Sequence, residues 1–349
     1  MAPSRPTKPV KHSLNTDDLL NKPYELVSFP KKRPTLKAPV GHHRYIPNGY
    51  HGTLCLTLSV KTALHVSTGI TAMGSDVNSR VPLIKTMTQG ENKQLVIQGS
   101  SLKGCVRAIY EAITNSTLGT ISSGKKVPKG KRMPKDREPC KDKTKLCPAS
   151  QVFGALNWQG LLHFSDAYCT AKSPVTGLMP PLHRPRPDQR EEYFDGNKAA
   201  GRKFYHHARE AVDGGSRGTP VQQAGTEYRF KTELQFLNLS QAQLGTLLIS
   251  LGQDTDYPMA LKLGGGKPVG LGTVQVAVSE VEVAQDVSDR YKQYAVPESS
   301  KLTGDELTNF VQKAVKAAHS EKLVEADQLA ELHEVLKWPT NREAPRGMY

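Results

Sequence analysis

The stretch Ile97-Gln98-Gly99-Ser100-Ser101-Leu102-Lys103-Gly104-Cys105-Val106-Arg107 joins a short polar turn to the start of a helix. Apolar residues recur behind it at the spacing of one helix face: Leu102, Val106, Ile109, Tyr110 and Ile113. The first turn of a helix has unpaired amide groups and the positive end of the helix dipole. We therefore predict that Ser100, Ser101, Lys103 and Arg107 bind a phosphate group. The alternative is a capped helix whose cationic face is solvated.

A second glycine-rich segment lies far downstream, Leu263-Gly264-Gly265-Gly266-Lys267-Pro268-Val269-Gly270-Leu271-Gly272. Successive backbone amides in such a loop bind anions, and Lys267 adds a positive charge. We predict that Gly264, Gly265, Gly266 and Lys267 contact a nucleic-acid backbone. An ordinary hairpin connection is the alternative, since glycine clusters commonly form turns.

The composition favours a nucleic-acid partner. The 349 residues include 47 Lys and Arg against 33 Asp and Glu, a formal net charge of +14. An anionic membrane would also attract this charge, but the chain has no apolar run of membrane-spanning length and no apolar signal core. Only 6% of the residues are aromatic, which favours contacts to phosphate and sugar over base stacking. Five irregularly spaced cysteines without a secretory signal indicate a reducing, cytoplasmic location and no disulfide framework. Because no run is long enough to span a membrane, we expect no membrane partner.

Hydrophobic periodicity predicts six regular elements in the order strand, helix, strand, strand, helix, strand. We place them at residues 52–60, 100–115, 160–166, 228–239, 240–251 and 273–283. This order predicts an α+β fold of the ferredoxin-like, RRM-like βαββαβ type, with an antiparallel sheet and helices on one face.

Composition divides the chain into three parts. Residues 1–50 form a basic, proline-rich N-terminal arm, residues 51–290 the core, and residues 291–349 a helical C-terminal extension. Two insertions with weak periodicity interrupt the core at about 118–159 and 170–227. Residues 121–147 carry ten Lys and Arg against three acids, so this run is either a solvated segment or one that folds on RNA.

Several motifs in register resemble the RAMP superfamily of CRISPR-associated proteins, in particular the backbone subunits of type III effector complexes. Besides Gln98–Arg107 and the glycine-rich loop at 264–272, the matching segments are Leu64–Gly69, Cys147–Gly154, Phe164–Ala167 and Gly201–His207. The resemblance implies a guide (crRNA)-binding subunit of an antiviral ribonucleoprotein, which packs beside other RAMP and large subunits and positions complementary single-stranded target RNA. A hairpin or an inserted thumb would press between bases.

The resemblance also implies further site residues. Asp76, in the loop Met73–Arg80, is the candidate for a catalytic carboxylate that cuts target RNA with the help of a divalent metal such as Mg²⁺. Asp76 is alternatively a turn residue of a non-catalytic structural subunit. We expect further RNA contacts from five residues: Lys61, His65, Arg80, Arg202 and Lys203. A structural role for His65 and a basic surface stretch around Arg202 are the alternatives, and the strand-end residue Asp166 is expected to order the neighbouring loop.

Cys140 and Cys147, the latter followed by Pro148, resemble a zinc knuckle that relatives insert before the Phe-Gly motif. A structural zinc site needs four ligands, and Ser150 stands where a further cysteine is expected. The remaining candidates are His42, His43, His51 and Cys169, and two unligated thiols are the alternative. A nucleotide-binding enzyme is the least favoured function, because the chain has no P-loop Gly-Lys-Ser/Thr and no dinucleotide-binding fingerprint.

Overall fold

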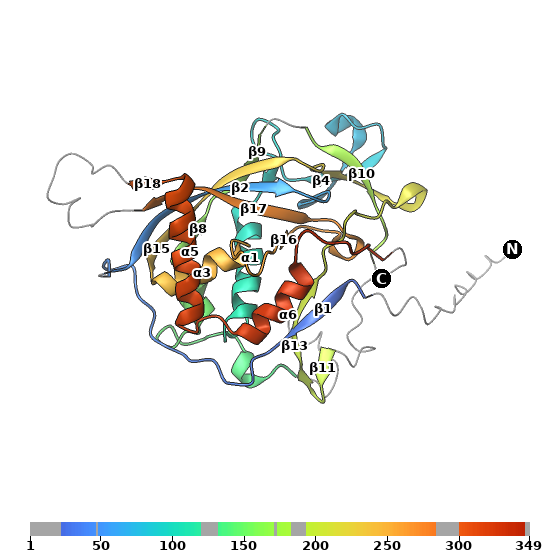
Figure 1. The fold of residues 1–349 in the computed structure, drawn as a ribbon. Coiled ribbons are helices and arrows are strands. Elements are labelled where there is room, and N and C mark those ends of the chain that lie inside the picture. The colour runs from blue at the N-terminus through green and yellow to red at the C-terminus, as the bar shows by residue number, and fades with distance from the viewer. Residues whose placement is uncertain are drawn as a thin grey trace.

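The computed structural model describes residues 22–46, 48–119, 132–170, 173–182, 193–283 and 300–345. Figure 1 shows the arrangement of their helices and strands. Residues 121–131 of the predicted basic run, much of the N-terminal arm and part of the second predicted insertion lie outside the described residues.

An eight-stranded sheet forms the centre of the molecule. Its strands follow the order β16-β17-β2-β15-β9-β5, with β18 paired to β17 and β8 paired to β15. Their bounds are β2 Tyr50–Val60, β5 Val96–Ile97, β8 Leu162–Phe164, β9 Ala167–Cys169, β15 Arg229–Leu239, β16 Leu261–Lys262, β17 Thr273–Val283 and β18 Ser300–Leu302. The predicted alternation holds in β2, where Leu54, Leu56, Leu58 and Val60 are buried against the core.

Four of these strands and two helices come from the elements that periodicity predicted. β17, β2, β15 and β8 lie side by side in this order, and each is antiparallel to its neighbours. Helix α1, Gly99–Ile113, contacts β8 and β16, and helix α3, Gln241–Ser250, contacts β15. α3 begins with a capping box, in which the hydroxyl of Ser240 accepts from the Gln243 amide and the Gln243 side chain accepts from the Ser240 amide. The architecture is therefore mixed α+β, as predicted.

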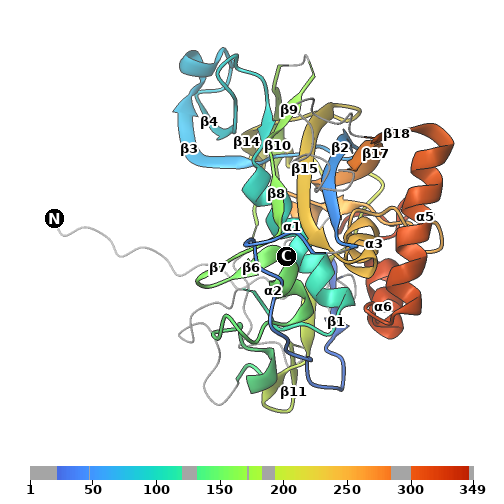
Figure 2. The same ribbon diagram turned by 90° about the vertical axis from the view of Figure 1, so that its left-hand side faces the viewer.

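The C-terminal helices cover the helical layer. α5, Gly304–Ser320, packs along α3, and α6, Ala326–Leu336, packs on α1 and on β1, Tyr24–Ser28. Figure 2 shows α3 between the central strands and α5. α3 and α5 approach closely at Gly245, where an added Cβ would lie 1.9 Å from the carbonyl oxygen of Ala314.

The parts of the chain that periodicity left as loops form smaller sheets. A four-stranded sheet has the order β10-β14-β4-β3, and β1 pairs with β13. The bounds of these elements and of the remaining short ones are β3 Ser67–Met73, β4 Leu83–Met87, α2 Pro148–Phe153, β6 Gly154–Ala155, β7 Trp158–Gln159, β10 Val175–Met179, β11 Phe194–Asp195, β12 Lys198–Ala199, β13 Gly201–Tyr205 and β14 Thr219–Gln223. Single 3-10 turns lie at Gly74–Val77, Lys135–Arg137, Gly215–Arg217 and Lys267–Val269. The second predicted insertion thus contributes strands to three sheets: β10 and β14 to the four-stranded sheet, β13 to the pair with β1, and β11 and β12 to a sheet of their own.

Within the predicted strand at 160–166 only β8 forms, and a further strand, β9, follows after Ser165 and Asp166. The chain bends there because Ser165 is held through both backbone groups. Its amide donates to the carbonyl of Glu233, and its carbonyl accepts from the hydroxyl of Thr232.

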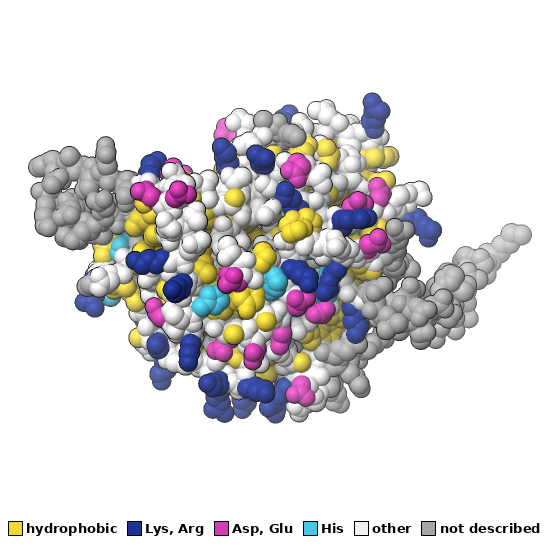
Figure 3. Space-filling model, viewed as in Figure 1, with side chains coloured by type: hydrophobic (Ala, Val, Ile, Leu, Met, Phe, Trp, Pro, Cys, Tyr) yellow, Lys and Arg dark blue, Asp and Glu magenta, His cyan; other side chains and the backbone are white. Residues whose placement is uncertain are grey.

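None of the helices among the described residues has both the length and the apolar character needed to cross a bilayer. On the face that carries α5 and α6, basic and acidic side chains are interspersed (Figure 3).

Candidate nucleic-acid interface

A groove of about 400 Å³ lies where three segments distant in the sequence meet. Ser101 and Gly104 of α1 form one wall, Lys203 of β13 a second, and Lys262 of β16 with Gly264 and Lys267 of the glycine-rich loop a third. Among the described residues, its lining includes three lysines and no carboxylate. The groove therefore has the charge to hold an anion.

The α1 wall exposes helix backbone. A Cβ added to Gly104 would meet no atom within 4 Å, so the glycine leaves open space in front of the helix. The first turn itself is capped, because the amide of Gly99 donates to Asp166 Oδ1 at 2.7 Å. Asp166 thus caps the start of α1, and its carboxylate accepts from the first amide of the helix, where we predicted a phosphate. Ser100 is exposed beside it.

Lys103 and Arg107 do not line the groove. Lys103 Nζ donates to the carbonyl of Leu162 at 3.0 Å, on another side of α1 from Ser101. Arg107 Nε donates to Glu111 Oε1 at 2.7 Å, and Arg202 donates to the other oxygen of the same carboxylate. The Glu111 side chain is only 2% exposed, so the two guanidinium groups are held in a largely buried ion cluster. The predicted joint phosphate contact of Lys103 and Arg107 in this groove is therefore not formed.

The glycine-rich loop needs its glycines for conformation and for space. Gly264 has a φ of +77°, and a Cβ there would lie 2.5 Å from the carbonyl oxygen of His65. That carbonyl accepts from the amide of Gly265 at 2.9 Å, which fixes the loop to the segment after β2. Lys267 begins the 3-10 turn and makes no ion pair among the described residues. Its ammonium group is thus available to a ligand.

Lys262 is a groove residue that sequence reasoning missed. Its side chain is buried, and Nζ donates to the carbonyl of Gly270 at 3.2 Å. Burial, together with the nearby charge of Lys267, lowers the pKa of Lys262 to about 7. The available signal was a lysine between Leu261 and Leu263, in an apolar segment that leads into the glycine loop.

A buried histidine supports the same region. His207 Nε2 lies 3.0 Å from the carbonyl of Ala260, to which it donates, and Nδ1 lies 2.9 Å from the Thr273 hydroxyl. Burial, and then the charge of Lys262, lower the pKa of His207 to about 3. The imidazole of His207, which lies near Lys262, is therefore neutral around pH 7.

Lys203 is held by aromatic rings. Its Nζ lies 3.8 Å from the ring centroid of Tyr24 and 4.7 Å from that of Tyr205, and it donates to the Tyr193 hydroxyl at 3.1 Å. These cation–π contacts hold the ammonium group at the groove wall. The contribution of Tyr24, which lies in the predicted N-terminal arm, was not foreseen.

The other predicted RNA contacts lie elsewhere. The His65 side chain is buried, its Nδ1 lies 2.6 Å from the carbonyl of Gln222, and burial lowers its pKa. The buried His65 side chain packs against the glycine-rich loop and is not placed to touch RNA. This position corrects the predicted contact between His65 and RNA. Lys61 pairs with Glu227 at 3.1 Å. Asp76 and Arg80 are exposed in the connection between β3 and β4, and neither lines the groove.

The predicted zinc ligands form a small buried cluster. Thr117 Oγ1 lies 3.3 Å from Cys140 Sγ and 3.2 Å from Cys147 Sγ, and Cys147 Sγ lies 3.3 Å from Ser150 Oγ. The hydrogen bond from the Cys140 thiol lowers the pKa of Cys147 and raises that of Cys140. Two thiols and two hydroxyls do not fit a structural zinc site. No group of three or more His, Cys, Asp or Glu side chains among the described residues is arranged to hold a metal ion.

The fold and the groove define a mixed α+β protein with a lysine-lined cleft beside a glycine-rich loop. The family model of the RAMP superfamily matches residues 57–275, more than half of the sequence, and the chain belongs to this superfamily. The matched residues include α1, β13, β16 and the whole glycine-rich loop.

Comparison with solved structures finds a chain in the "Cryo-EM structure of the Type III-B Cmr-beta bound to cognate target RNA". The two chains are 13% identical and superpose with a TM-score of 0.35. The match covers 68% of this chain and 61% of the other, so it spans less than two thirds of that relative. A search of curated proteins gave no match.

Proposed function

We propose that this protein is a guide-RNA-binding subunit of a type III CRISPR effector complex that positions complementary target RNA. The observation that carries the proposal is the groove, in which α1, Lys203 and the glycine-rich loop come together from distant parts of the chain. Lysines and backbone amides hold phosphates without reading bases, as a protein whose guides differ in sequence requires. Other RAMP and large subunits are the partners that go with this function.

The strand order supports the ferredoxin-like form of the core. In a βαββαβ chain the fourth strand pairs with the first, the first with the third and the third with the second. The order β17-β2-β15-β8 has this form, with α1 and α3 as the two helices. Residues 118–159 and 170–227 are then insertions between core elements, and β18, α5 and α6 form the C-terminal extension.

Charge reversal at the free lysine tests RNA binding. Lys267→Glu should lower affinity for single-stranded RNA about tenfold and reduce the slope of log K against log salt by about one. The fold should persist, because Lys267 is partly exposed and makes no ion pair among the described residues. Fluorescence anisotropy over a salt series measures both quantities. Lys313→Glu, on the exposed surface of α5, is the charge-matched control. Equal affinity and slope for Lys267→Glu and this control would refute the groove as the RNA site.

We also propose that Asp76 takes part in cleavage of target RNA. Its carboxylate is exposed in the turn Gly74–Val77 and accepts a hydrogen bond from the Ser75 hydroxyl at 3.2 Å. One carboxylate suffices for Mg²⁺ when substrate phosphates and water supply the other ligands, and the metal would neutralise charge at the scissile phosphate. Asp76 would hold the ion and orient it toward the bound strand.

Asp76→Ala in the assembled complex should reduce target cleavage about a hundredfold or more while guide binding stays unchanged. Product bands on a denaturing gel measure the first and filter retention the second. Asp305→Ala, an exposed carboxylate of α5, is the control. Unchanged bands with Asp76→Ala would make the chain a non-catalytic structural subunit.

A further inference from the structure

Two basic stretches of the chain lie side by side beyond the end of α1. One is residues 31–37, which follow β1, and the other is residues 137–146, within the first predicted insertion. The backbones of Lys37 and Leu146 pair, with N–O distances of 3.0 and 2.8 Å. None of these residues lines the groove. The basic patch is the set of exposed cations on the two stretches that form no ion pair among the described residues: Lys31, Lys32, Arg33, Lys37, Lys143 and Lys145.

A buried arginine joins the two stretches at their other end. The Arg137 side chain is only 2% exposed, and its guanidinium donates to the carbonyls of Pro30 and Lys32, the latter at 2.7 Å. It also donates to the carbonyl of Ser116, just after α1, at 3.3 Å. These hydrogen bonds hold backbone groups and leave the side chains of Lys31 and Lys32 in solvent. The exposed cations therefore project from a fixed backbone.

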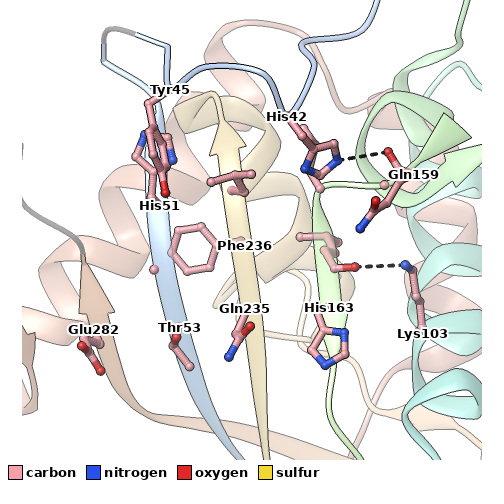
Figure 4. A pocket seen from close by; sticks show the side chains of 15 residues that line it. His42, Tyr45, His51, Thr53, Lys103, Gln159, His163, Gln235, Phe236 and Glu282 are labelled. Carbon is pink, nitrogen blue, oxygen red and sulfur yellow. Dashed lines mark hydrogen bonds between the residues drawn. The ribbon is translucent and has the colours of Figure 1, made fainter. Parts of the chain in front are cut away.

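The N-terminal stretch is fixed again further along the chain. His42 Nε2 lies 3.4 Å from the carbonyl of Gln159, and Figure 4 shows the imidazole directed at this carbonyl. Asn238 Nδ2 donates to the carbonyl of Gly41 at 3.0 Å. Residues 31–37 are thus held on both sides, which reduces the conformational entropy that is lost when a ligand binds them.

The carboxylates of the same stretches are already engaged. Glu138 Oε2 lies 3.7 Å from Lys141 Nζ, and Asp136 Oδ2 lies 3.8 Å from Nε of the buried guanidinium. Asp142 accepts from the amide and the hydroxyl of Thr144, at 2.9 and 2.7 Å. The cations of the basic patch therefore have no ion pair in the described part of the chain. A polyanion would relieve the repulsion between them.

We propose that the basic patch binds a second stretch of the RNA whose backbone lies in the groove. Ser101, in the first turn of α1, lines the groove, and Asn115, just after the end of α1, donates to the carbonyl of Arg33 at 3.2 Å. α1 has 15 residues and is therefore about 22 Å long, so one strand that follows the helix reaches both places. The proposal rests on the proposed function, because it takes RNA as the ligand and adds a contact for the same strand.

Phosphodiester groups fit the basic patch better than an acidic protein surface does. The centre of a protein–protein interface is usually apolar and poor in charge. In residues 31–37 and 137–146, all of which the structure describes, Leu36 is the only exposed large hydrophobic side chain. Fixed, exposed lysines and arginines instead suit a strand that is bound through phosphates and the release of counterions.

RNA length distinguishes the basic patch from the groove. The probes are fluorescent oligouridylates of about 4 and about 16 nucleotides, the range of site sizes of one single-strand-binding fold. The patch variant is Lys32→Glu with Lys143→Glu, because both side chains are exposed and neither forms a hydrogen bond among the described residues. Lys313→Glu with Lys316→Glu, two exposed lysines of α5, is the charge-matched control. Anisotropy over a salt series measures affinity and its salt dependence.

We expect the patch variant to bind the long RNA about tenfold more weakly than the control, with a salt slope smaller by about two, and to bind the short RNA as the control does. If Lys267→Glu weakens binding of the long RNA and the patch variant does not, the basic patch is refuted and the proposed function stands. A loss in the patch variant alone would support the basic patch and refute the groove. No loss in either variant would refute both.

Poly-glutamate tests for an acidic protein partner. It should displace the long RNA from the wild-type protein far less readily than unlabelled oligouridylate does at equal charge concentration. Equal displacement by the two competitors would assign the basic patch to an acidic protein segment and overturn its assignment to RNA.

Discussion

Lys262 shows how a single residue connects the fold to the groove. The carbonyl of Gly270 accepts from Lys262 Nζ at 3.2 Å and from the Thr62 hydroxyl at 2.8 Å, so the glycine-rich loop is tied to the end of β2. Lys262 lies near the positive charge of Lys267 and the neutral imidazole of His207, and it forms no ion pair with a carboxylate of the described residues. An anion in the groove would stabilise the charged form of this amine.

The burial of Lys262 predicts a dependence of stability on pH. The pKa of Lys262 is lowered to about 7 from its ordinary 10.5. Between these values the unfolded chain holds a proton on this amine that the folded chain lacks, so the free energy of unfolding rises with pH across this window. Below about 7 the folded protein bears the full cost of the buried charge. The contribution reaches about 1.4 kcal/mol per pH unit.

Lys262→Met should therefore be more stable than the wild type near neutral pH and should show a flatter pH profile. Urea unfolding at a series of pH values from neutral into the alkaline range measures this profile. Lys313→Met, which removes a solvent-exposed lysine of α5, should keep the wild-type slope. A wild-type slope in Lys262→Met would mean that the amine is not desolvated in the folded protein.

At the scale of elements, sequence patterns predicted those helices and strands that local interactions stabilise. The predicted strand at 273–283 is confirmed, the predicted helix at 240–251 is found at Gln241–Ser250 behind a capping box, and the predicted helix at 100–115 is found at Gly99–Ile113. Each of these elements has its own periodicity or cap, so its existence depends little on distant residues.

The elements that were missed depend on pairing between distant segments. β1 pairs with β13 about 175 residues later, from Tyr24 opposite Tyr205 to Ser28 opposite Gly201. β14 joins β4 in parallel through a bridge between Val221 and Lys85. Short strands of this kind have no alternating pattern long enough to detect, and their register is set by tertiary packing.

The same limit applies to the candidate site. The sequence identified the glycine-rich loop and the start of α1 from their residue types, and the structure brings both to one groove. It did not indicate that Glu111 would hold Arg107 and Arg202, or that Asp166 would cap α1, because these contacts join residues 67 to 91 positions apart or depend on which helix face is buried. The positive charge of a lysine or arginine in the sequence does not show whether a carboxylate pairs with it in the folded protein.

At the scale of the whole molecule, the C-terminal helices are part of the body that holds the groove. α5 covers α3, and α6 packs on α1 and β13, so that Leu336 at the end of α6 lines the groove. Packing of these helices thus supports the wall formed by α1. The close approach at Gly245 is where this packing is most sensitive to side-chain size.

Two helical glycines test this packing as a matched pair. Replacing glycine by alanine inside a helix stabilises it by about 0.5–1 kcal/mol when space allows. Gly104→Ala should follow this rule, because its added Cβ meets no atom within 4 Å. Gly245→Ala should instead destabilise the protein by about 1–3 kcal/mol, because its Cβ would lie 1.9 Å from the Ala314 carbonyl oxygen and would force α5 away from α3. Thermal and urea unfolding of both variants measure the difference. If Gly245→Ala were as stable as Gly104→Ala, α5 would not pack closely on α3, and the C-terminal helices would not support the groove.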